Sequence, residues 1–248
     1  MSLMTRRRMM GGSVLQEDIR LWISGEDAPK KLQNQKWIIT DRTDTDSTDK
    51  TFIIGERTDT TFESFYDLQN KRYDFTSQAN QAYNNWNTSS YDFGHHWKLY
   101  FDMDVRVYSG ATKGRYFLDL GSIASASHSF GFSMGIGADG SNAVGVNWKL
   151  NGNNSNPGIG TLMHGYQTQK QAGEYDSVSG YYAIIDGGDG YDYLEINING
   201  VVERYNVKIY PTGYSPPWNI NKFVVGGAID SSYGLPCYIR ELKMVVID

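Results

Sequence analysis

The sequence predicts an all-β protein in which two antiparallel sheets pack face to face as a sandwich. An unbroken alternation of apolar and polar residues runs from Trp97 to Tyr108, and shorter alternating stretches recur along the chain. The chain contains 27 Gly and 18 Tyr, and only 21% of its residues are charged, which is typical of short strands joined by turns. Roughly twelve strand-like stretches without a long helix fold most simply as two packed sheets.

Composition bounds the classes of function. The 248 residues suffice for one large β domain, and 40% of them are apolar. A net charge of −5 argues against a nucleic-acid-binding surface, which is usually basic. No apolar run approaches the ~20 residues that cross a bilayer, so we expect no membrane insertion. Cys237 is the only cysteine, which excludes a disulfide within the chain.

The predicted domain organisation is a flexible N-terminal arm, residues 1–16, followed by a single sandwich domain, residues 17–248. Three arginines, two methionines and two glycines follow one another in the arm, and its alternative role is attachment to a larger assembly. The start of the chain lacks the apolar segment of a signal peptide. We therefore expect a protein that is cytoplasmic as synthesised, with virion association or release as the alternatives.

Residues 17–90 are the least regular part of the chain. Short strands are predicted at 21–24, 36–40 and 51–55, a helical turn at 62–68, and a long loop carrying aromatic residues beyond it. The acidic loop DRTDTDSTD, Asp41–Asp49, has carboxylates at alternate positions, as calcium loops do. It lacks their central glycine and their glutamate at the twelfth position. We favour a solvated loop without metal and keep calcium as the alternative.

The stretch Trp97–Tyr108 is the longest predicted strand, roughly 40 Å at about 3.3 Å per residue. Its period of two places one set of residues on a buried face and the other on an outward face. The buried set is Trp97, Leu99, Phe101, Met103, Val105 and Val107. Further strands are predicted at 115–120, 162–167, 181–185 and 223–229, and a hairpin joins 130–136 to 144–150.

Asn199–Gly200 indicates a tight type I′ hairpin, because both central residues of that turn have positive φ. When residues are counted outward from this turn, Ile198 pairs with Val201, Glu195 with Arg204, and Leu194 with Tyr205. Val201 then lies on the buried face, and Glu195 and Arg204 pair on the exposed one. Glu203 falls opposite Ile196 on the buried face, so it lies at a rim or a bulge shifts the register.

The closing stretch CYIRELKMVVID contains apolar residues that share one face only if an extra residue stands near Arg240–Glu241, so we predict a bulge there. The order of these stretches, with FVVGGAID before YIRELKMVV, resembles the concanavalin A-like lectin/glucanase superfamily and its laminin-G-like branch. The resemblance covers about residues 92–248. It implies a jelly-roll sandwich with a concave sheet, and it leaves lectins, glycosidases and structural domains open.

An enzymatic role is the less favoured reading. The resemblance implies catalytic carboxylates in an E-x-D-x-x-E or E-x-D-x-E pattern, which is absent. Asp102 and Asp104 are the nearest match, and alternate strand residues stand about 6.6 Å apart. That spacing is nearer an inverting than a retaining glycosidase. The alternative is a solvated face or one salt-bridged by Lys98 and Arg106, so we predict that the protein is not an enzyme.

Carbohydrate recognition is the predicted function, with a glycan or glycoconjugate as the partner and no cofactor. Sugar sites combine flat aromatic rings with planar polar groups. The outward face of the long strand, a neighbouring strand and the loops supply both kinds. The candidate ligand-binding residues are Tyr100, Asp102, Asp104, Arg106, Tyr108, Asn147, Tyr166 and Trp218. The alternative is that these aromatic residues pack against the protein itself and bind no sugar.

A structural role is the second hypothesis. A basic, methionine-rich arm, no signal peptide and a lectin-like sandwich suit a phage or prophage tail component or another receptor-binding protein of a particle. Such proteins assemble into particles and often form homo-oligomers. The two hypotheses overlap when the particle's target is a surface glycan.

Overall fold

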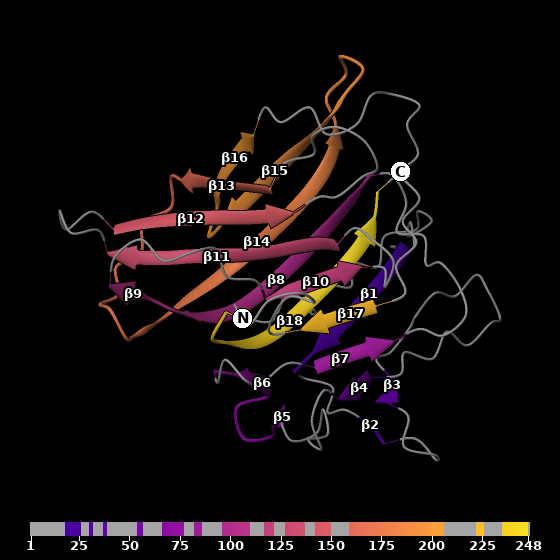
Figure 1. The fold of residues 1–248 in the computed structure, drawn as a ribbon, viewed down its shortest axis with the longest axis vertical. Helices are drawn as coiled ribbons and strands as arrows, with labels where there is room; N and C mark the ends of the chain where they lie inside the picture. The colour runs from indigo at the N-terminus through magenta and orange to yellow at the C-terminus, as the bar shows by residue number, and fades with distance from the viewer. Residues whose placement is uncertain are drawn as a thin grey trace, which may run out of the picture.

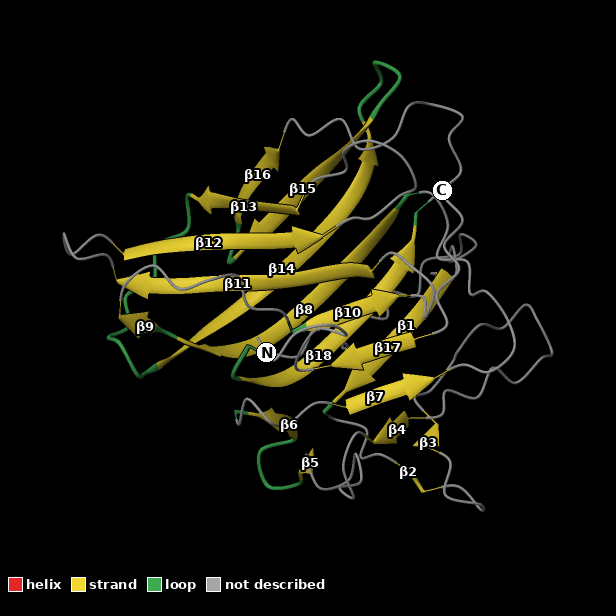
Figure 2. Ribbon diagram, viewed as in Figure 1, coloured by secondary structure: helices red, strands yellow, loops and turns green. Residues whose placement is uncertain are grey.

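The chain folds as an all-β protein in the parts that the structure, a computed structural model, describes. Those residues are 18–25, 30–31, 37–38, 54–56, 66–76, 82–85, 96–109, 117–121, 127–136, 142–149, 159–205, 222–225 and 235–247. They contain strands and no helix (Figure 2). None of the described segments is therefore a helix of the length and apolarity needed to cross a membrane.

Eight strands form the first sheet, in the order β16-β15-β14-β8-β18-β6-β5, with β1 also paired to β18. All of its pairings are antiparallel. Its strands are β1 (Asp18–Ser24), β5 (Tyr66–Asp67), β6 (Arg72–Phe75), β8 (Trp97–Arg106), β14 (Tyr175–Asp186), β15 (Asp192–Ile198), β16 (Val201–Tyr205) and β18 (Cys237–Val246).

Eight further strands form the second sheet, in the order β13-β12-β11-β10-β17-β7-β4, with β9 parallel to β11 at one end. Its strands are β4 (Ile54–Glu56), β7 (Ala82–Asn85), β9 (Tyr108–Ser109), β10 (Leu118–Gly121), β11 (Ser127–Ile136), β12 (Asn142–Lys149), β13 (Ile159–His164) and β17 (Lys222–Val225). β2 (Lys30–Lys31) and β3 (Trp37–Ile38) pair separately. The strands of the second sheet run across those of the first at an angle (Figure 1).

One apolar core joins the two sheets, as the sandwich prediction requires. Phe101 and Tyr182 of the first sheet lie with ring centroids 6.1 and 6.3 Å from that of Phe117, which directly precedes β10 of the second. Val144 and Val146 of β12 are fully buried in the same cluster. The all-β, two-sheet antiparallel sandwich is thus confirmed, while the jelly-roll and laminin-G-like assignments stay predictions.

The long strand shows the predicted alternation, with its apolar residues buried and most of its polar residues partly exposed. The strand ends earlier than predicted, because β8 stops at Arg106 and the chain then crosses to the second sheet as β9. Val107 is the fully buried crossing residue. Its amide donates to the Glu174 carbonyl at 2.9 Å, and its own carbonyl accepts from the Gly173 amide at 2.8 Å.

The Asn199–Gly200 hairpin is confirmed, with φ of 49° and 87° and the predicted β15–β16 register. Arg204 and Glu195 pair at 3.7 Å. Val201 is a correction: it is 37% exposed on the strand β16, which stands at the edge of the first sheet. Glu203 lies at a rim without a register shift, where its carboxylate accepts from the Gly165 amide at 2.9 Å.

The predicted bulge in the closing strand is present between Ile239 and Glu241. Arg240 is the extra residue, and its carbonyl accepts a hydrogen bond from the Gly25 amide at 2.8 Å. On one side of this point β18 pairs with β6, and on the other side it pairs with β1. The bulge therefore marks the place where the neighbouring strand of β18 changes.

The region before the long strand corrects the sequence analysis. Residues 66–67 are β5 rather than a helical turn, and β6 and β7 occupy part of the predicted loop. Strands this short give little periodicity, and their pairing with distant strands decides their conformation. The arm 1–16 and the acidic loop Asp41–Asp49 lie outside the described residues, so their predicted roles stay predictions.

Candidate ligand-binding face

The polar residues of β8 share the outward face of the first sheet with residues of β14 and β18. Tyr100 stands between Tyr181 and Lys243 in the register, and Asp104 stands between Ser177 and Tyr238. The opposite side of the same strands is the buried core. This arrangement brings together residues that are far apart in the sequence, and we call it the outward face.

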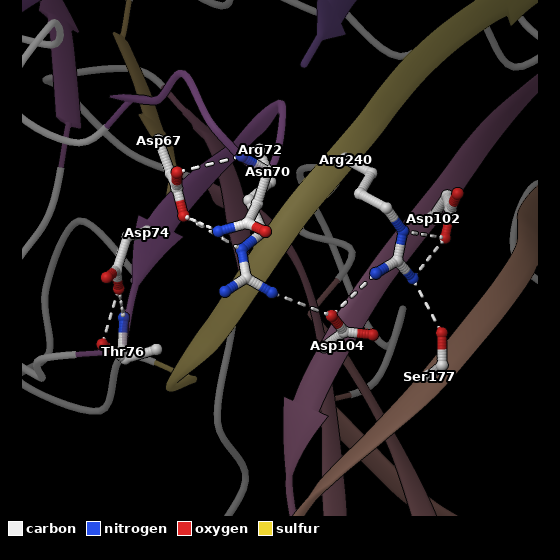
Figure 3. Close-up of polar contacts among 9 residues, drawn as sticks. All are labelled: Asp67, Asn70, Arg72, Asp74, Thr76, Asp102, Asp104, Ser177 and Arg240. Carbon is white, nitrogen blue, oxygen red and sulfur yellow. Dashed lines mark hydrogen bonds and ion pairs between the residues drawn. The ribbon is translucent and has the colours of Figure 1, made fainter. Parts of the chain in front are cut away.

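The centre of the outward face is an ion-pair network around Arg240 (Figure 3). Arg240 donates from Nε and Nη2 to Asp102 Oδ1 at 2.9 and 2.7 Å, and its Nη1 lies 2.7 Å from Asp104 Oδ2. Nη2 also donates to Ser177 Oγ at 2.8 Å. Arg72 of β6 adds a longer contact of 3.5 Å to Asp104 Oδ2. We call these five residues the Arg240 network.

The β-bulge explains why Arg240 bridges both carboxylates. As the extra residue of β18, Arg240 has no directly opposite partner on β8 and lies alongside Asp102 and Asp104. Burial disfavours charge on the guanidinium, but the hydrogen bonds and charges of the two aspartates outweigh it and raise the pKa of Arg240. Four donor contacts fix the guanidinium, and through it both carboxylates.

One oxygen of each aspartate is left for a ligand. Asp102 Oδ2 and Asp104 Oδ1 accept no hydrogen bond from the described residues, and Figure 3 draws contacts only to their other oxygens. The side chains are 42% and 18% exposed. The face therefore presents two carboxylate oxygens whose positions are fixed before any ligand arrives.

A tyrosine pair lies on one side of the Arg240 network. The rings of Tyr100 and Tyr181 meet edge to face with centroids 6.0 Å apart. Lys98 Nζ lies 4.6 Å from the Tyr181 ring centroid, and Lys243 Nζ lies 5.3 Å from that of Tyr100. Burial, and then the hydrogen bond to Glu195, raise the pKa of Tyr181 to about 12. The Tyr181 hydroxyl is consequently a hydrogen-bond donor across the neutral range.

A second tyrosine pair lies on the other side of the network. Tyr175 and Tyr238 have ring centroids 5.1 Å apart, and the Arg72 guanidinium carbon lies 3.6 Å above the Tyr238 ring. Arg106 is the exposed end of β8, with its guanidinium carbon 5.7 Å from the Tyr108 ring centroid. Aromatic rings thus flank the carboxylates at both ends of the face.

The structure brings together some of the predicted ligand-binding residues and separates others. Tyr100, Asp102, Asp104 and Arg106 share the outward face, and Tyr108 stands beside Arg106 although it belongs to the second sheet. Tyr166 packs against the core and donates from its hydroxyl to Asp176 at 2.9 Å.

The remaining two predicted residues are not placed on the face. Asn147 lies on β12 of the second sheet, paired with Gly131 and Thr161, so its strand is no neighbour of β8. Nothing is described of its side chain. Trp218 falls outside the described residues.

Several residues of the face were not predicted from the sequence. They are Arg72, Tyr175, Ser177, Tyr181, Tyr238 and Arg240. The predicted bulge at Arg240 was a usable indication, because an extra residue turns its side chain out of the regular alternation. The sequence analysis paired the aspartates with Lys98 and Arg106, whereas Arg240 and Arg72 are the observed partners. Residues two apart on one strand are less close than residues on adjoining strands.

Other reactive groups lie away from the face. Cys237 is fully buried, and burial raises the pKa of its thiol. Within the part of the chain that the structure describes, no three His, Cys, Asp or Glu residues group as metal ligands. His96 Nε2 lies 2.9 Å from Asp192 Oδ1 near the start of β8. These residues do not add a catalytic group to the Arg240 network.

His164 gives the fold a dependence on pH. Its Nδ1 accepts from the Tyr166 amide at 3.1 Å, and its Nε2 lies 3.5 Å from the Ile196 carbonyl. Burial lowers the pKa of His164 below its usual 6.5, and Glu203 and that carbonyl offset this only in part. The unfolded chain therefore takes up the proton more readily, and stability is lost as the pH falls below about 6.5.

We expect His164→Asn, which keeps an acceptor near the Nδ1 position but does not titrate, to flatten this dependence. The measurement is the free energy of unfolding in denaturant between about pH 7 and pH 5 for both proteins. The wild-type protein should lose more stability over that interval than the variant. Parallel profiles would show that His164 protonation contributes nothing.

Comparisons with known proteins leave the chain without a family. No protein-family model matches the sequence, and no curated protein sequence matches it significantly. Solved structures are similar at low sequence identity. One of them is a GH54 α-L-arabinofuranosidase, at 16% identity and a TM-score of 0.41. There, 71% of this chain corresponds to 37% of the other.

Two further structures have similar β-rich architectures. Botulinum neurotoxin type C, whose cell entry depends on two ganglioside molecules, matches at 12% identity and a TM-score of 0.49, over 93% of this chain and 49% of that one. The carbohydrate recognition domain of Emp47p matches at 13% identity and a TM-score of 0.41, over 91% of this chain and 97% of that one. This chain spans less than half the length of the enzyme and toxin chains. Similarity at this level assigns neither a family nor a function.

Proposed function

We propose that the protein recognises a carbohydrate, without catalysis, through the outward face of the first sheet. The observation that carries this proposal is the pair of aspartates that Arg240 fixes between two tyrosine pairs, each with one carboxylate oxygen left for a ligand. Sugar hydroxyls donate hydrogen bonds to carboxylates, and the apolar faces of pyranose rings pack on aromatic rings. Because Arg240 already fixes the aspartates, a ligand orders few additional side chains.

The same geometry supports a role other than hydrolysis. A glycosidase places the scissile bond between its two carboxylates. Here the guanidinium of Arg240 contacts both Asp102 and Asp104 and occupies the space between them. The two carboxylates act as hydrogen-bond acceptors in this proposal, and Arg240 positions them.

The length of the face favours an oligosaccharide over a single sugar. Tyr100 and Arg106 stand six residues apart on β8, about 20 Å at 3.3 Å per residue. Aromatic rings lie at both ends of this span and the two aspartates lie between them. A chain of sugars can contact both tyrosine pairs at once, which one ring cannot.

We expect the purified protein to bind members of a broad oligosaccharide panel in a direct binding assay. Tyr100→Ala should weaken binding about tenfold, because a lost aromatic stacking contact is worth about 1 kcal/mol or more. Tyr100→Phe should keep most of the affinity, since it retains the ring. Leu68→Ala, at a 73% exposed position in the β5–β6 turn, is the surface control.

Calcium chelation is a separate arm of the same assay, and we expect it to change nothing. Lost binding would assign a role to the acidic loop Asp41–Asp49. If the folded protein binds no oligosaccharide, or if Tyr100→Ala binds as the wild type does, carbohydrate recognition by this face is wrong.

A further inference from the structure

Arg106 differs from three other arginines of the first sheet. Arg240 and Arg72 contact the aspartates of the network, and Arg204 pairs with Glu195. Arg106 is exposed and makes no ion pair with any residue in the described part of the chain. Its guanidinium lies beside the Tyr108 ring instead. This end of the face therefore carries a cation whose charge no described carboxylate neutralises.

Tyrosines surround this cation. Tyr175 stands opposite Arg106 in the β8–β14 register, and its ring contacts that of Tyr238. Burial raises the pKa of Tyr175, Tyr238 and the Asp74 charge add to the effect, and Arg106 opposes it. The Tyr175 hydroxyl therefore keeps its proton at neutral pH and is a donor.

Asp74, an acidic residue whose charge acts on Tyr175, has partners of its own. Asp74 of β6 accepts a hydrogen bond from the Thr76 amide at 2.8 Å and another from the Thr76 hydroxyl at 2.5 Å. Figure 3 shows Asp74 directed at Thr76, apart from the Arg240 network. The donors around Arg106, which comprise its guanidinium and the hydroxyl of Tyr175, are thus of one kind, and they suit an anion.

We infer that the ligand is an acidic glycan, whose carboxylate or sulfate binds Arg106 and the Tyr175 hydroxyl. This inference rests on the proposed function and narrows it to a class of glycan. A planar guanidinium matches a carboxylate or sulfate with two parallel hydrogen bonds. The exposed oxygens of Asp102 and Asp104 then accept from hydroxyls of the adjoining sugars, and they repel an acidic group placed there. The acidic group therefore lies at the Arg106 end.

The test compares three oligosaccharide series of matched length by titration calorimetry at low salt. Chito-oligosaccharides are neutral, hyaluronan oligosaccharides carry carboxylates, and chondroitin sulfate oligosaccharides carry carboxylates and sulfates. We expect at least one acidic series to bind about tenfold more tightly than the neutral one, as a hydrogen-bonded charge contact warrants. Added salt should reduce this difference, because the Arg106 end is exposed.

Variants assign the difference to Arg106. Arg106→Gln should remove the preference for the acidic series, because it weakens binding of that series much more than binding of the neutral one. Arg106→Lys should restore part of the preference, because it keeps the charge without the planar fork. Arg204→Gln is the matched control, since Arg204 is also exposed on the first sheet but lies on the edge strand β16. This variant should change neither the preference for the acidic series nor the affinity for the neutral one.

The outcomes separate this inference from the proposed function. Preference for hyaluronan assigns the carboxylate, and preference for chondroitin sulfate alone assigns the sulfate. If neutral and acidic series bind equally and both depend on Tyr100, the acidic class is overturned and carbohydrate recognition stands. The assignment of an acidic glycan is also overturned if Arg106→Gln weakens the binding of all three series alike. If nothing binds, both proposals fall.

Discussion

Replacing Arg240 by glutamine is expected to lower the free energy of unfolding by about 2 kcal/mol. The change removes the contacts to Asp102, Asp104 and Ser177 and leaves two carboxylates side by side on β8. Breaking a buried ion pair costs about 3–5 kcal/mol, and the partial exposure of this network reduces that figure. Denaturant titration measures the loss.

Two comparisons make the Arg240 result specific. Arg204→Gln removes an exposed ion pair with an N–O distance of 3.7 Å and should cost under about 1 kcal/mol. Adding Asp102→Asn and Asp104→Asn to Arg240→Gln should restore part of the stability, because it removes the two carboxylates that lose Arg240, of which only Asp104 keeps a contact within the described residues, at 3.5 Å to Arg72. Equal losses for Arg240→Gln and Arg204→Gln would mean that the network is a set of ordinary surface contacts.

Gly180→Ala is expected to cost about 3 kcal/mol or more, because the added Cβ overpacks the contact between β14 and β15. A Cβ at Gly180 would overlap the backbone carbonyl of Asn197 and approach the Phe101 ring to 3.3 Å. A backbone oxygen cannot rotate away as a side chain does, so β14 and β15 must separate. That separation strains the two hydrogen bonds from the Ser179 and Asn199 amides that join the strands there.

Gly188→Ala is the control for Gly180→Ala. Gly188 has φ of 72° and nothing within 4 Å of its added Cβ, so only the left-handed backbone opposes the change, at about 1 kcal/mol. For a chain of this length, each kcal/mol corresponds to about 2–4 °C in melting temperature. Equal melting temperatures for the two variants would show that β14 and β15 are not as close at Gly180 as the structure has them.

The parts of the fold that were predictable are those in which neighbouring residues carry the information. The alternation in β8 shows itself within ten residues, and Asn199–Gly200 fixes a turn and with it the register of two strands. The bulge at Arg240 follows from a break in the apolar period. In each case a local pattern suffices, because the two faces of a strand have different surroundings.

The candidate site was only half predictable for the same reason. Tyr100, Asp102, Asp104 and Arg106 are neighbours in the sequence, whereas Arg240 meets Asp102 across 138 residues. Which strands adjoin β8 depends on the whole sheet order, and no short pattern contains it. Tyr166 shows the converse error: it was chosen as a ligand-binding candidate, but it is partly buried against the core and donates a hydrogen bond to Asp176.

The position of β18 affects how the protein is made. This strand, residues 237–246, lies in the middle of the first sheet, between β8 on one side and β1 and β6 on the other. It leaves the ribosome about 130 residues after β8, roughly 7 to 26 seconds later at about 5–20 residues per second. Until then, the edge of β8 that pairs with β18 has no partner strand, and its backbone N–H and C=O groups can pair with other nascent chains. We therefore expect refolding from denaturant to be slow, because pairing strands so far apart in the sequence is slow.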